Sequence, residues 1–311
     1  MKPMLLADDL KAESTGDKTR ARVTRAWARF FSERLGSPLE AATVLETDEM
    51  AWELNMLHKS YSRLLSNAYT KSFEKTKLDT VANKLRAHPL FLVGSPVREL
   101  VKLAQGNKFQ MMVLGTHGHQ GAKRMFLGSV AEEIVRQSEI PVCVLGPQVQ
   151  KNGVMPPKSG KFNIVVATDL DRGSRAAEAF AIKLAKEIGG SITLVHCAYQ
   201  GQAPMVQIAL NSPEGQAAVA SMYKDLTRDL KALLKKRQKS IEKAGVECKV
   251  ILETRSGTSY RAIVRTVERE EGTIVVTGTQ GRGLLGQAFF GSTARQTILR
   301  SPVPVVIVRS R

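Results

Sequence analysis

Cysteine is scarce in this chain: the three copies, Cys143, Cys197 and Cys248, are an odd number and cannot all pair within one molecule. Each falls in an apolar stretch typical of a buried strand, so the pattern indicates reduced thiols and argues against a disulfide scaffold. Their spacing is not that of metal ligands. The sequence also lacks an apolar run long enough to cross a bilayer, and residues 1–6 are too few for the apolar part of a signal peptide. We therefore expect a cytoplasmic protein.

Recognisable catalytic machinery is missing as well. The sequence shows no nucleophile set of the Ser/His/Asp kind, no general acid/base pair, and no phosphate loop of the G-x4-G-K-S/T type with its lysine. His117 and His119 suggest a base or a metal site, but loop histidines more often contact phosphate or solvent. The adjacent carboxylates Asp8 and Asp9 are one further arrangement that can hold a metal. We assign no catalytic residue and no metal ligand.

Length and hydrophobic content, in contrast, are sufficient for two domains. The chain has 311 residues, of which 43% are hydrophobic, enough for two ordinary cores. Residues 148–161 form a polar stretch with Gly, Pro and Lys and no apolar periodicity, which is typical of a linker. The predicted organisation is therefore one domain over residues 1–147, the linker, and a second domain over residues 162–311.

A glycine pattern that occurs twice is the most informative feature of the sequence. The copies are Gly115-x-x-Gly118-x9-Gly128-Ser129 and Gly278-x-x-Gly281-x9-Gly291-Ser292, and every position is displaced by 163 residues. One glycine pattern alone is weak evidence. Two copies in the same register indicate a duplicated unit with one common role.

Each copy lies between a strand pattern and a helix pattern. The apolar runs 111–114 and 273–276 precede the first glycines, and helical periodicity begins near Ser129 and Ser292. Glycines allow the backbone to approach a phosphate closely, and a helix start offers free N–H groups and a positive dipole end. The pattern therefore predicts an anion site. The alternative interpretation is that the serines are only helix N-caps and the glycines only supply positive φ angles.

These residues resemble the universal stress protein family in its tandem two-domain form, and in particular its ATP-binding subclass. Members show G-x-x-G-x9-G-S/T between the fourth strand and the fourth helix, with an aspartate ending the first strand. Here Asp9 and Asp169 match that aspartate, although Asp8 before it is replaced by Thr168 in the second copy. The resemblance implies that the aspartates contact adenosine and that the loop backbone and its serine hold phosphates. Arg282, next to the second glycine of its copy, is a further candidate contact.

The fold expected from this pattern is α/β. Alternating strand and helix patterns predict two tandem doubly wound domains, each with a parallel sheet of about five strands, of the Rossmann-like, adenine nucleotide alpha-hydrolase type. By the resemblance, the last strands of the two domains, 142–145 and 305–308, should lie against each other as an intrachain pseudo-dimer. The second strand of the first half, 39–45, is less apolar than its counterpart near 192–195, so we expect the first pocket to be the weaker.

Positive charge is the second marked feature, with a formal net charge of +17 carried mostly by the second half. Part of it lies on a predicted helix from about 213 to 244, whose other face is expected to carry Tyr223, Leu226, Leu230, Leu233 and Ile241. A surface for nucleic acid or anionic lipid is one interpretation. A solvated amphipathic helix that covers the sheet is the preferred one, because lysine side chains ordinarily reach out to solvent from such positions. The lysines 235 and 236 and Arg237 are predicted to be surface charges without a role in nucleotide binding.

The function expected from the sequence is adenine-nucleotide binding in a stress response, acting by nucleotide occupancy on an unidentified regulated protein. ATP is the first candidate ligand, another adenine nucleotide the second, and an accompanying Mg²⁺ is left open. Two alternatives remain: slow ATP hydrolysis in the same pockets, or a basic scaffold for nucleic acid or membrane with vestigial nucleotide sites. Nucleic acid and membrane are not the expected partners, since no recognition motif for either is present. Assembly of two chains into a homodimer is left open.

Overall fold

The computed structural model describes residues 1–10, 15–46, 61–116, 127–198, 204–254, 257–279 and 290–309. The strands within them are β1 Met4–Ala7, β2 Leu39–Leu45, β3 His88–Val93, β4 Met112–Gly115, β5 Val142–Leu145, β6 Asn163–Ala167, β7 Ser191–Cys197, β8 Cys248–Glu253, β9 Ile274–Gly278 and β10 Val305–Val308. The α-helices are α1 Thr15–Arg34, α3 Tyr61–Leu85, α4 Pro96–Ala104, α5 Ser129–Gln137, α6 Pro147–Lys151, α7 Arg175–Ile188, α8 Pro204–Ala209, α9 Pro213–Lys243, α10 Ser259–Arg269 and α11 Ser292–Arg300. Short 3₁₀ turns lie at Gln105–Asn107 and Arg172–Ser174.

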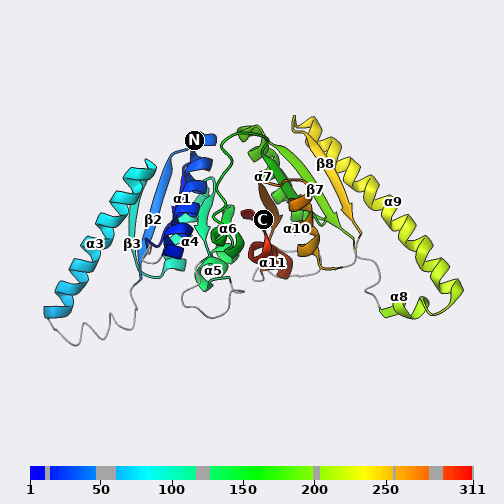
Figure 1. Ribbon diagram of the computed structural model, residues 1–311, viewed down its shortest axis with the longest axis horizontal. Helices are drawn as coiled ribbons and strands as arrows, with labels where there is room; N and C mark the ends of the chain where they lie inside the picture. Colours follow the sequence, from blue (N-terminus) through cyan, green and yellow to red (C-terminus); the bar gives the residue numbers. More distant parts are fainter. Residues whose placement is uncertain are drawn as a thin grey trace.

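All ten strands join one sheet, in the order β3-β2-β1-β4-β5-β10-β9-β6-β7-β8 (Figure 1). Strands β1 to β5 are mutually parallel, and so are β6 to β10. Each half therefore has the doubly wound order 3-2-1-4-5, as the alternating strand and helix patterns predict. The α/β fold of two tandem five-stranded parallel units is confirmed.

The two halves meet through their last strands. Strands β5 and β10 pair antiparallel, and Cys143 faces Val306 in this pairing. These two residues are separated by the same 163 positions as the repeated glycines, so the centre of the pairing coincides with a pseudo-twofold axis between the halves. The predicted pseudo-dimer contact is confirmed. It also covers a strand edge in each half that would otherwise be exposed and apolar.

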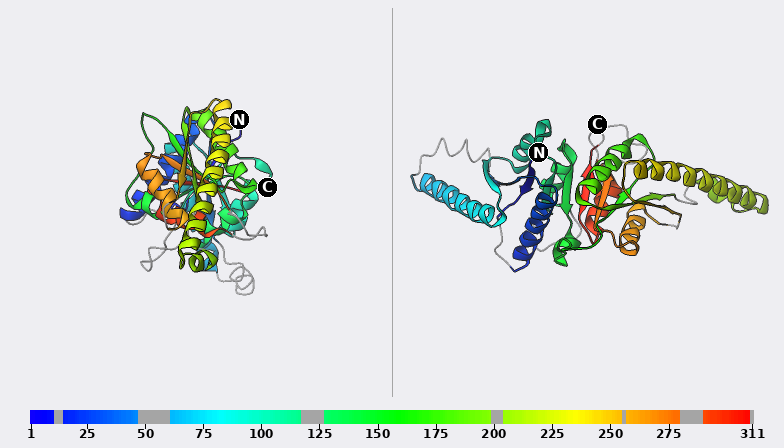
Figure 2. Two further views of the ribbon diagram at one scale, coloured as in Figure 1. Left: turned by 90° about the vertical axis from the view of Figure 1, so that its right-hand side faces the viewer. Right: turned by 90° about the horizontal axis from the view of Figure 1, so that it is seen from above.

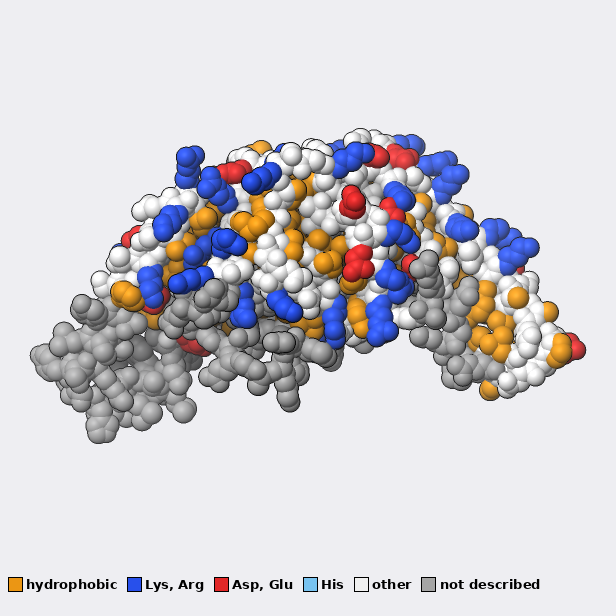
Figure 3. Space-filling model, viewed as in Figure 1, with side chains coloured by type: hydrophobic (Ala, Val, Ile, Leu, Met, Phe, Trp, Pro, Cys, Tyr) orange, Lys and Arg blue, Asp and Glu red, His pale blue; other side chains and the backbone are white. Residues whose placement is uncertain are grey.

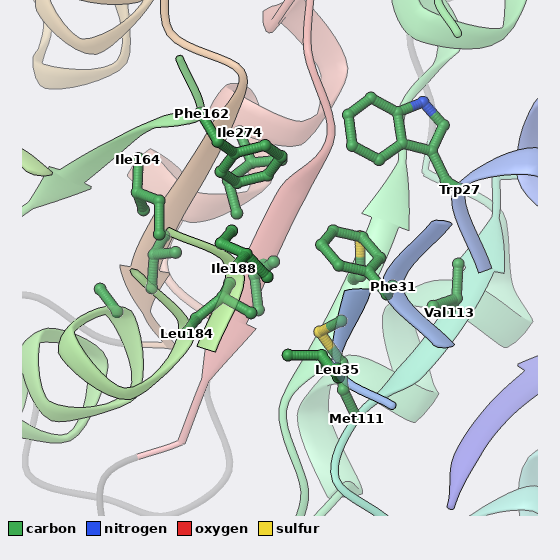
Figure 4. Packing of buried hydrophobic residues seen from close by; sticks show 14 of the residues in the cluster. Trp27, Phe31, Leu35, Met111, Val113, Phe162, Ile164, Leu184, Ile188 and Ile274 are labelled. Atoms are coloured by element: carbon green, nitrogen blue, oxygen red, sulfur yellow. The ribbon is translucent and has the colours of Figure 1, made fainter. Parts of the chain in front are cut away.

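Helices cover both faces of this sheet (Figures 1 and 2). Adjacent residues of one strand serve opposite faces: Met4 and Leu6 belong to the core under α1, α7 and α9, whereas Leu5 belongs to the core under α4, α5, α10 and α11. Such strands are apolar throughout because neither side meets water. The first of these cores runs without interruption from one half to the other, and Figure 4 shows its side chains from both halves facing one another.

The segment predicted as a polar linker packs closely against the first half. It begins inside α6, where Val149 is buried, and the carbonyl of Val154 accepts a hydrogen bond from Trp27 Nε1 at 2.9 Å. At its end, the ring of Phe162 stacks on that of Phe30 with centroids 5.6 Å apart. The connection therefore contributes to the core, which its polar composition does not indicate.

Helix α9 is amphipathic, as expected, and packs on β8 with Leu230, Leu234 and Ile241 buried. Its buried face is narrower than predicted, because Leu226 is 43% and Leu233 is 49% exposed. Lys and Arg side chains are spread over both halves on the face shown in Figure 3, rather than gathered on α9. Among the described helices, none is both long and apolar enough to cross a membrane.

Candidate functional site

The two candidate aspartates occupy equivalent places at the carboxyl ends of the central strands. Leu5 pairs with Met112 and Val165 pairs with Val275, so the first strands of the halves align with an offset of 160 residues. This offset makes Asp9 and Asp169 equivalent. Both are half-buried. Each follows the first strand of its half, which lies between the second and the fourth strand, where the strand order reverses. In open α/β sheets this is the place where ligands bind.

A tight turn presents each aspartate. Leu10 and Leu170 have φ values of 58° and 64°, a left-handed conformation that is unfavourable for branched residues. The N–H group of Leu10 donates to Asp8 Oδ1 at 2.8 Å, and that of Leu170 donates to Thr168 Oγ1 at 3.0 Å. The side chain of the residue before each candidate aspartate therefore stabilises the turn by accepting a hydrogen bond from the residue after that aspartate.

In the first half, Asp8 is held by an arginine. Arg25 from α1 donates from Nε to Asp8 Oδ2 at 2.5 Å and from Nη2 to Asp8 Oδ1 at 3.0 Å. Burial lowers the pKa of Arg25, but its hydrogen bond with Asp8 and the charges of Asp8 and Asp9 outweigh this effect and raise the pKa overall. Asp8 is thus committed to an ion pair rather than to a metal. The described residues contain no group of three or more His, Cys, Asp or Glu side chains placed to hold a metal ion.

In the second half, a longer network supports the turn. Thr168 Oγ1 donates to Glu178 Oε1 at 2.7 Å and lies 2.9 Å from Ser174 Oγ. Arg237 Nη1 from α9 donates to Glu178 Oε2 at 3.0 Å, and its Nη2 approaches the carbonyl oxygen of Leu170 at 3.5 Å. The prediction that Arg237 is a surface charge was wrong. Only 23% of its side chain is exposed, because it is drawn into an ion pair with an almost fully buried carboxylate.

The helices that follow the glycine patterns both begin at a glycine-serine pair. Gly128 and Gly291 are the N-cap residues, and Ser129 and Ser292 are the first helical residues. The glycines have φ of −59° and −64° with ψ near 140°, which any residue can adopt. Neither explanation in the alternative interpretation holds here, since these serines are not N-caps and these glycines do not supply positive φ. The missing side chain leaves the first N–H groups of each helix open to an approaching anion.

In the second half, the strand end and the helix start lie side by side. The N–H group of Gly291 donates to the carbonyl of Thr279 at 2.8 Å, directly after Gly278 ends β9. Ser292, an exposed residue, therefore begins α11 near the carboxyl end of β9. The remaining candidates Gly118, Gly281 and Arg282 lie outside the described residues.

Gly115 has a packing role that the glycine pattern does not indicate. A Cβ atom on it would lie 2.3 Å from Gln150 Nε2 and 3.1 Å from Thr24 Oγ1. Gln150 is buried and comes from α6, the helix at the start of the linker. The connection between the halves therefore contacts the residue where the first glycine loop begins.

The cysteines do not contribute a reactive thiolate. All three are free, as predicted, and Cys143 and Cys248 are buried. Burial, with the nearby Glu253 carboxylate, raises the pKa of Cys197 to about 12 against a smaller opposing effect of Arg265. Burial also raises the pKa of Cys248 to about 12. These thiols stay protonated near neutral pH and behave as small apolar side chains.

Comparison with known proteins follows the same division of the chain. The model of the universal stress protein family matches residues 1–146 and again residues 162–309. The chain belongs to this family. The two matches make it a tandem, two-domain universal stress protein.

Individual relatives agree with this assignment. The universal stress protein MJ0531 of Methanocaldococcus jannaschii is 33% identical over 97 residues, which are 31% of this chain and 54% of that protein. The chain therefore spans about half the length of that relative. Rv2005c of Mycobacterium tuberculosis is 22% identical over 280 residues, covering 88% of this chain and 87% of its own. The solved structure of a universal stress protein from Archaeoglobus fulgidus has a TM-score of 0.64 at 19% identity, covers 99% of this chain and 96% of its own, and shows the same fold.

Within this universal stress protein, sequence analysis missed the residues that support the candidate site from a distance. Gln150, Glu178 and Arg237 come from three different helices and meet the site only in the folded chain. The sequence around position 178 contains one feature from which a supporting residue could have been predicted. A glutamate that interrupts an otherwise apolar helix face, beside Ala177 and Ala181, indicates a buried charge in need of a partner.

Proposed function

We propose that this protein binds one adenine nucleotide in each half, with ATP the first candidate, and that occupancy of these sites controls its action in a stress response. The observation that carries the proposal is the paired helix start at Gly128-Ser129 and Gly291-Ser292. Backbone angles there are open to any residue, yet both positions lack a side chain at the carboxyl end of the sheet. A helix start without a side chain in the way is suited to bind phosphate through its free N–H groups.

Residue roles in the proposal follow the resemblance to the ATP-binding members of the family. Asp9 and Asp169 contact the adenosine part of the ligand. The glycine loops, including Gly118 and Gly281, bring backbone N–H groups to the phosphates, and Ser129, Ser292 and Arg282 add side-chain donors. Mg²⁺ enters only as a companion of the phosphates, because Asp8 is engaged by Arg25.

The wider role is also part of the proposal. Three free cysteines fit a reducing compartment, so we assign the protein to the cytoplasm. Nucleotide binding is expected to change its affinity for a regulated protein, whose identity the fold does not specify. Both candidate sites lie in one chain whose last strands pair with each other.

Calorimetric titration of the purified protein with ATP and Mg²⁺ tests this function. We expect two bound nucleotides per chain. Asp9→Ala and Asp169→Ala should each weaken one site by about tenfold to a hundredfold, because a hydrogen bond to a charged group contributes about 1.5–3 kcal/mol. The loss should be larger for Asp169→Ala, since the first half has the less apolar second strand. Wild-type affinity in both variants would contradict the assignment.

A further inference from the structure

The two halves support the same turn with different charges, as the alignment of their helices shows. Helix α1 is followed by Gly36 and α7 by Gly189, and both glycines are in the left-handed conformation with φ of 58° and 73°. Arg25 lies eleven residues before the first glycine, and Glu178 lies eleven residues before the second. These two residues therefore occupy one position of the repeated unit, with opposite charge.

A second pair of equivalent positions lies on the outer helices. Helix α3 is followed by Arg86 with φ of 54°, and α9 is followed by Gly245 with φ of 83°. Leu78 and Arg237 each lie eight residues before these left-handed residues. Leu78 is fully buried in the first half, where no charge is required of it.

Three equivalent positions, on the strand end, the inner helix and the outer helix, carry different charges in the two halves. The first half uses an anion on the strand end, Asp8, and a cation on the inner helix, Arg25. The second half has a neutral Thr168 on the strand end, an anion on the inner helix at Glu178, and the cation on the outer helix at Arg237. In both halves the result is one buried carboxylate paired with one guanidinium beneath the turn.

We infer that Arg237 is a positioning residue of the second nucleotide site, acting through Glu178 and Thr168 to hold the turn that presents Asp169. This inference rests on the proposed function. Arg237 contacts the turn twice, through Glu178 and at the carbonyl of Leu170, the residue directly after Asp169. The imidazole of His196 also holds this turn, with Nδ1 donating to the carbonyl of Thr168 at 2.8 Å.

Physical chemistry explains why the turn requires such support. Leu170 adopts a left-handed conformation, and such strained residues persist only where the surroundings hold them in place. Removal of Arg237 leaves the Glu178 carboxylate, whose side chain is 8% exposed, without its cation. A buried charge that loses its partner is strongly destabilising. Thr168, which begins the turn, is bonded directly to Glu178 and is the group most exposed to this loss.

Titration with ATP and Mg²⁺ in an Asp9→Ala background, where the second site dominates the signal, tests the inference. Arg237→Leu, which copies Leu78 of the first half, should weaken ATP binding at the second site about tenfold. Lys235→Leu is the matched control, because Lys235 is an exposed cation on the same helix. It should leave the affinity unchanged. Arg237→Gln, which keeps a donor without the charge, should fall between the wild type and Arg237→Leu.

A rescue variant distinguishes a positioning role of Arg237 from a general contribution to the stability of the fold. The triple variant Thr168→Asp, Glu178→Arg, Arg237→Leu rebuilds the support of the first half inside the second. It should restore ATP affinity to within about threefold of the parent, and melting temperatures measured in parallel should follow. Restored melting temperature without restored affinity would overturn the inference.

Two further results distinguish the inference from the function on which it rests. If the Asp9→Ala parent binds ATP and Arg237→Leu binds it equally well, Arg237 only stabilises the fold and the inference is wrong. If the wild-type chain itself binds no adenine nucleotide, the proposed function is wrong, and the inference falls with it. Should Arg237→Leu fail to fold, the same comparison is made with Arg237→Gln and the triple variant.

Discussion

Single residues decide between a structural and a functional explanation of the glycine repeat. Gly128 and Gly291 adopt backbone angles that suit any residue, so their identity is not required by conformation. A Cβ atom on Gly115, in contrast, would lie 2.3 Å from Gln150 Nε2, so the buried Gln150 side chain would have to move. One glycine of the motif therefore has close packing neighbours, whereas the backbone conformation does not require glycine at the two helix starts. The proposed function gives these two glycines a role, since a helix start without a side chain lets a phosphate approach its N–H groups.

Alanine at these helix starts should separate folding from binding. We expect Gly128→Ala and Gly291→Ala to change the free energy of unfolding by no more than about 1 kcal/mol, the scale of an N-cap substitution. ATP affinity of the altered site should fall about tenfold, because the new methyl group blocks one charged hydrogen bond from the backbone. Urea denaturation and calorimetric titration measure the two effects. The exposed left-handed Gly106, with open space around it, provides a control as Gly106→Asn. Equal ATP affinity in the wild type and both alanine variants would restore the purely structural explanation.

The cysteines lead to a pH dependence at alkaline values. Burial raises the pKa of Cys197 and Cys248 to about 12 in the folded chain, above the usual value for an exposed thiol. Between pH 9 and 12 the unfolded chain loses these protons while the folded chain keeps them, so stability should fall as the pH rises through this range. Urea denaturation at several pH values measures the slope. Replacing both cysteines by alanine should make stability depend less steeply on pH in this range. An unchanged slope would contradict the raised pKa values of these two thiols.

Among the helices and strands, those with strong local patterns were predictable from the sequence. Strands β6, β9 and β10 are short apolar runs because both faces of the sheet are covered, and α7 ends at Gly189 in the left-handed conformation that glycine favours. Strand β3 has a weaker signal, since Pro89 lies within it. Proline is compatible with this strand because β3 is at the edge of the sheet.

Elements whose role depends on distant contacts were not predictable. The linker contains a helix and packs along α1, where Trp27 and Phe30 contact Val154 and Phe162, which lie far from them in the sequence. The exposure of Leu226 and Leu233 reflects where the sheet lies beneath α9, which helical periodicity alone does not reveal. For the same reason the candidate aspartates and serines could be named from motifs, whereas the supporting Arg237 could not.

At the scale of the whole molecule, one sheet with a core on each face combines two copies of the same unit. The pairing of β5 with β10 continues the sheet across the pseudo-twofold axis. Arg295 of α11 and Glu132 of α5 form an ion pair at 3.3 Å, which links the two helices that begin at the candidate phosphate sites. The duplication therefore places the two candidate sites on one continuous sheet, and the proposed function requires both to bind nucleotide.

Nucleotide stoichiometry tests this central claim most directly. Native mass spectrometry of the purified chain with ATP and Mg²⁺ should show two nucleotides bound per chain, and one in either Gly118→Val or Gly281→Val. The double variant should bind none while keeping the wild-type circular dichroism spectrum, because a branched side chain in each loop blocks the approach of the phosphates. Two nucleotides bound to the folded double variant would contradict the site assignment and with it the proposed function.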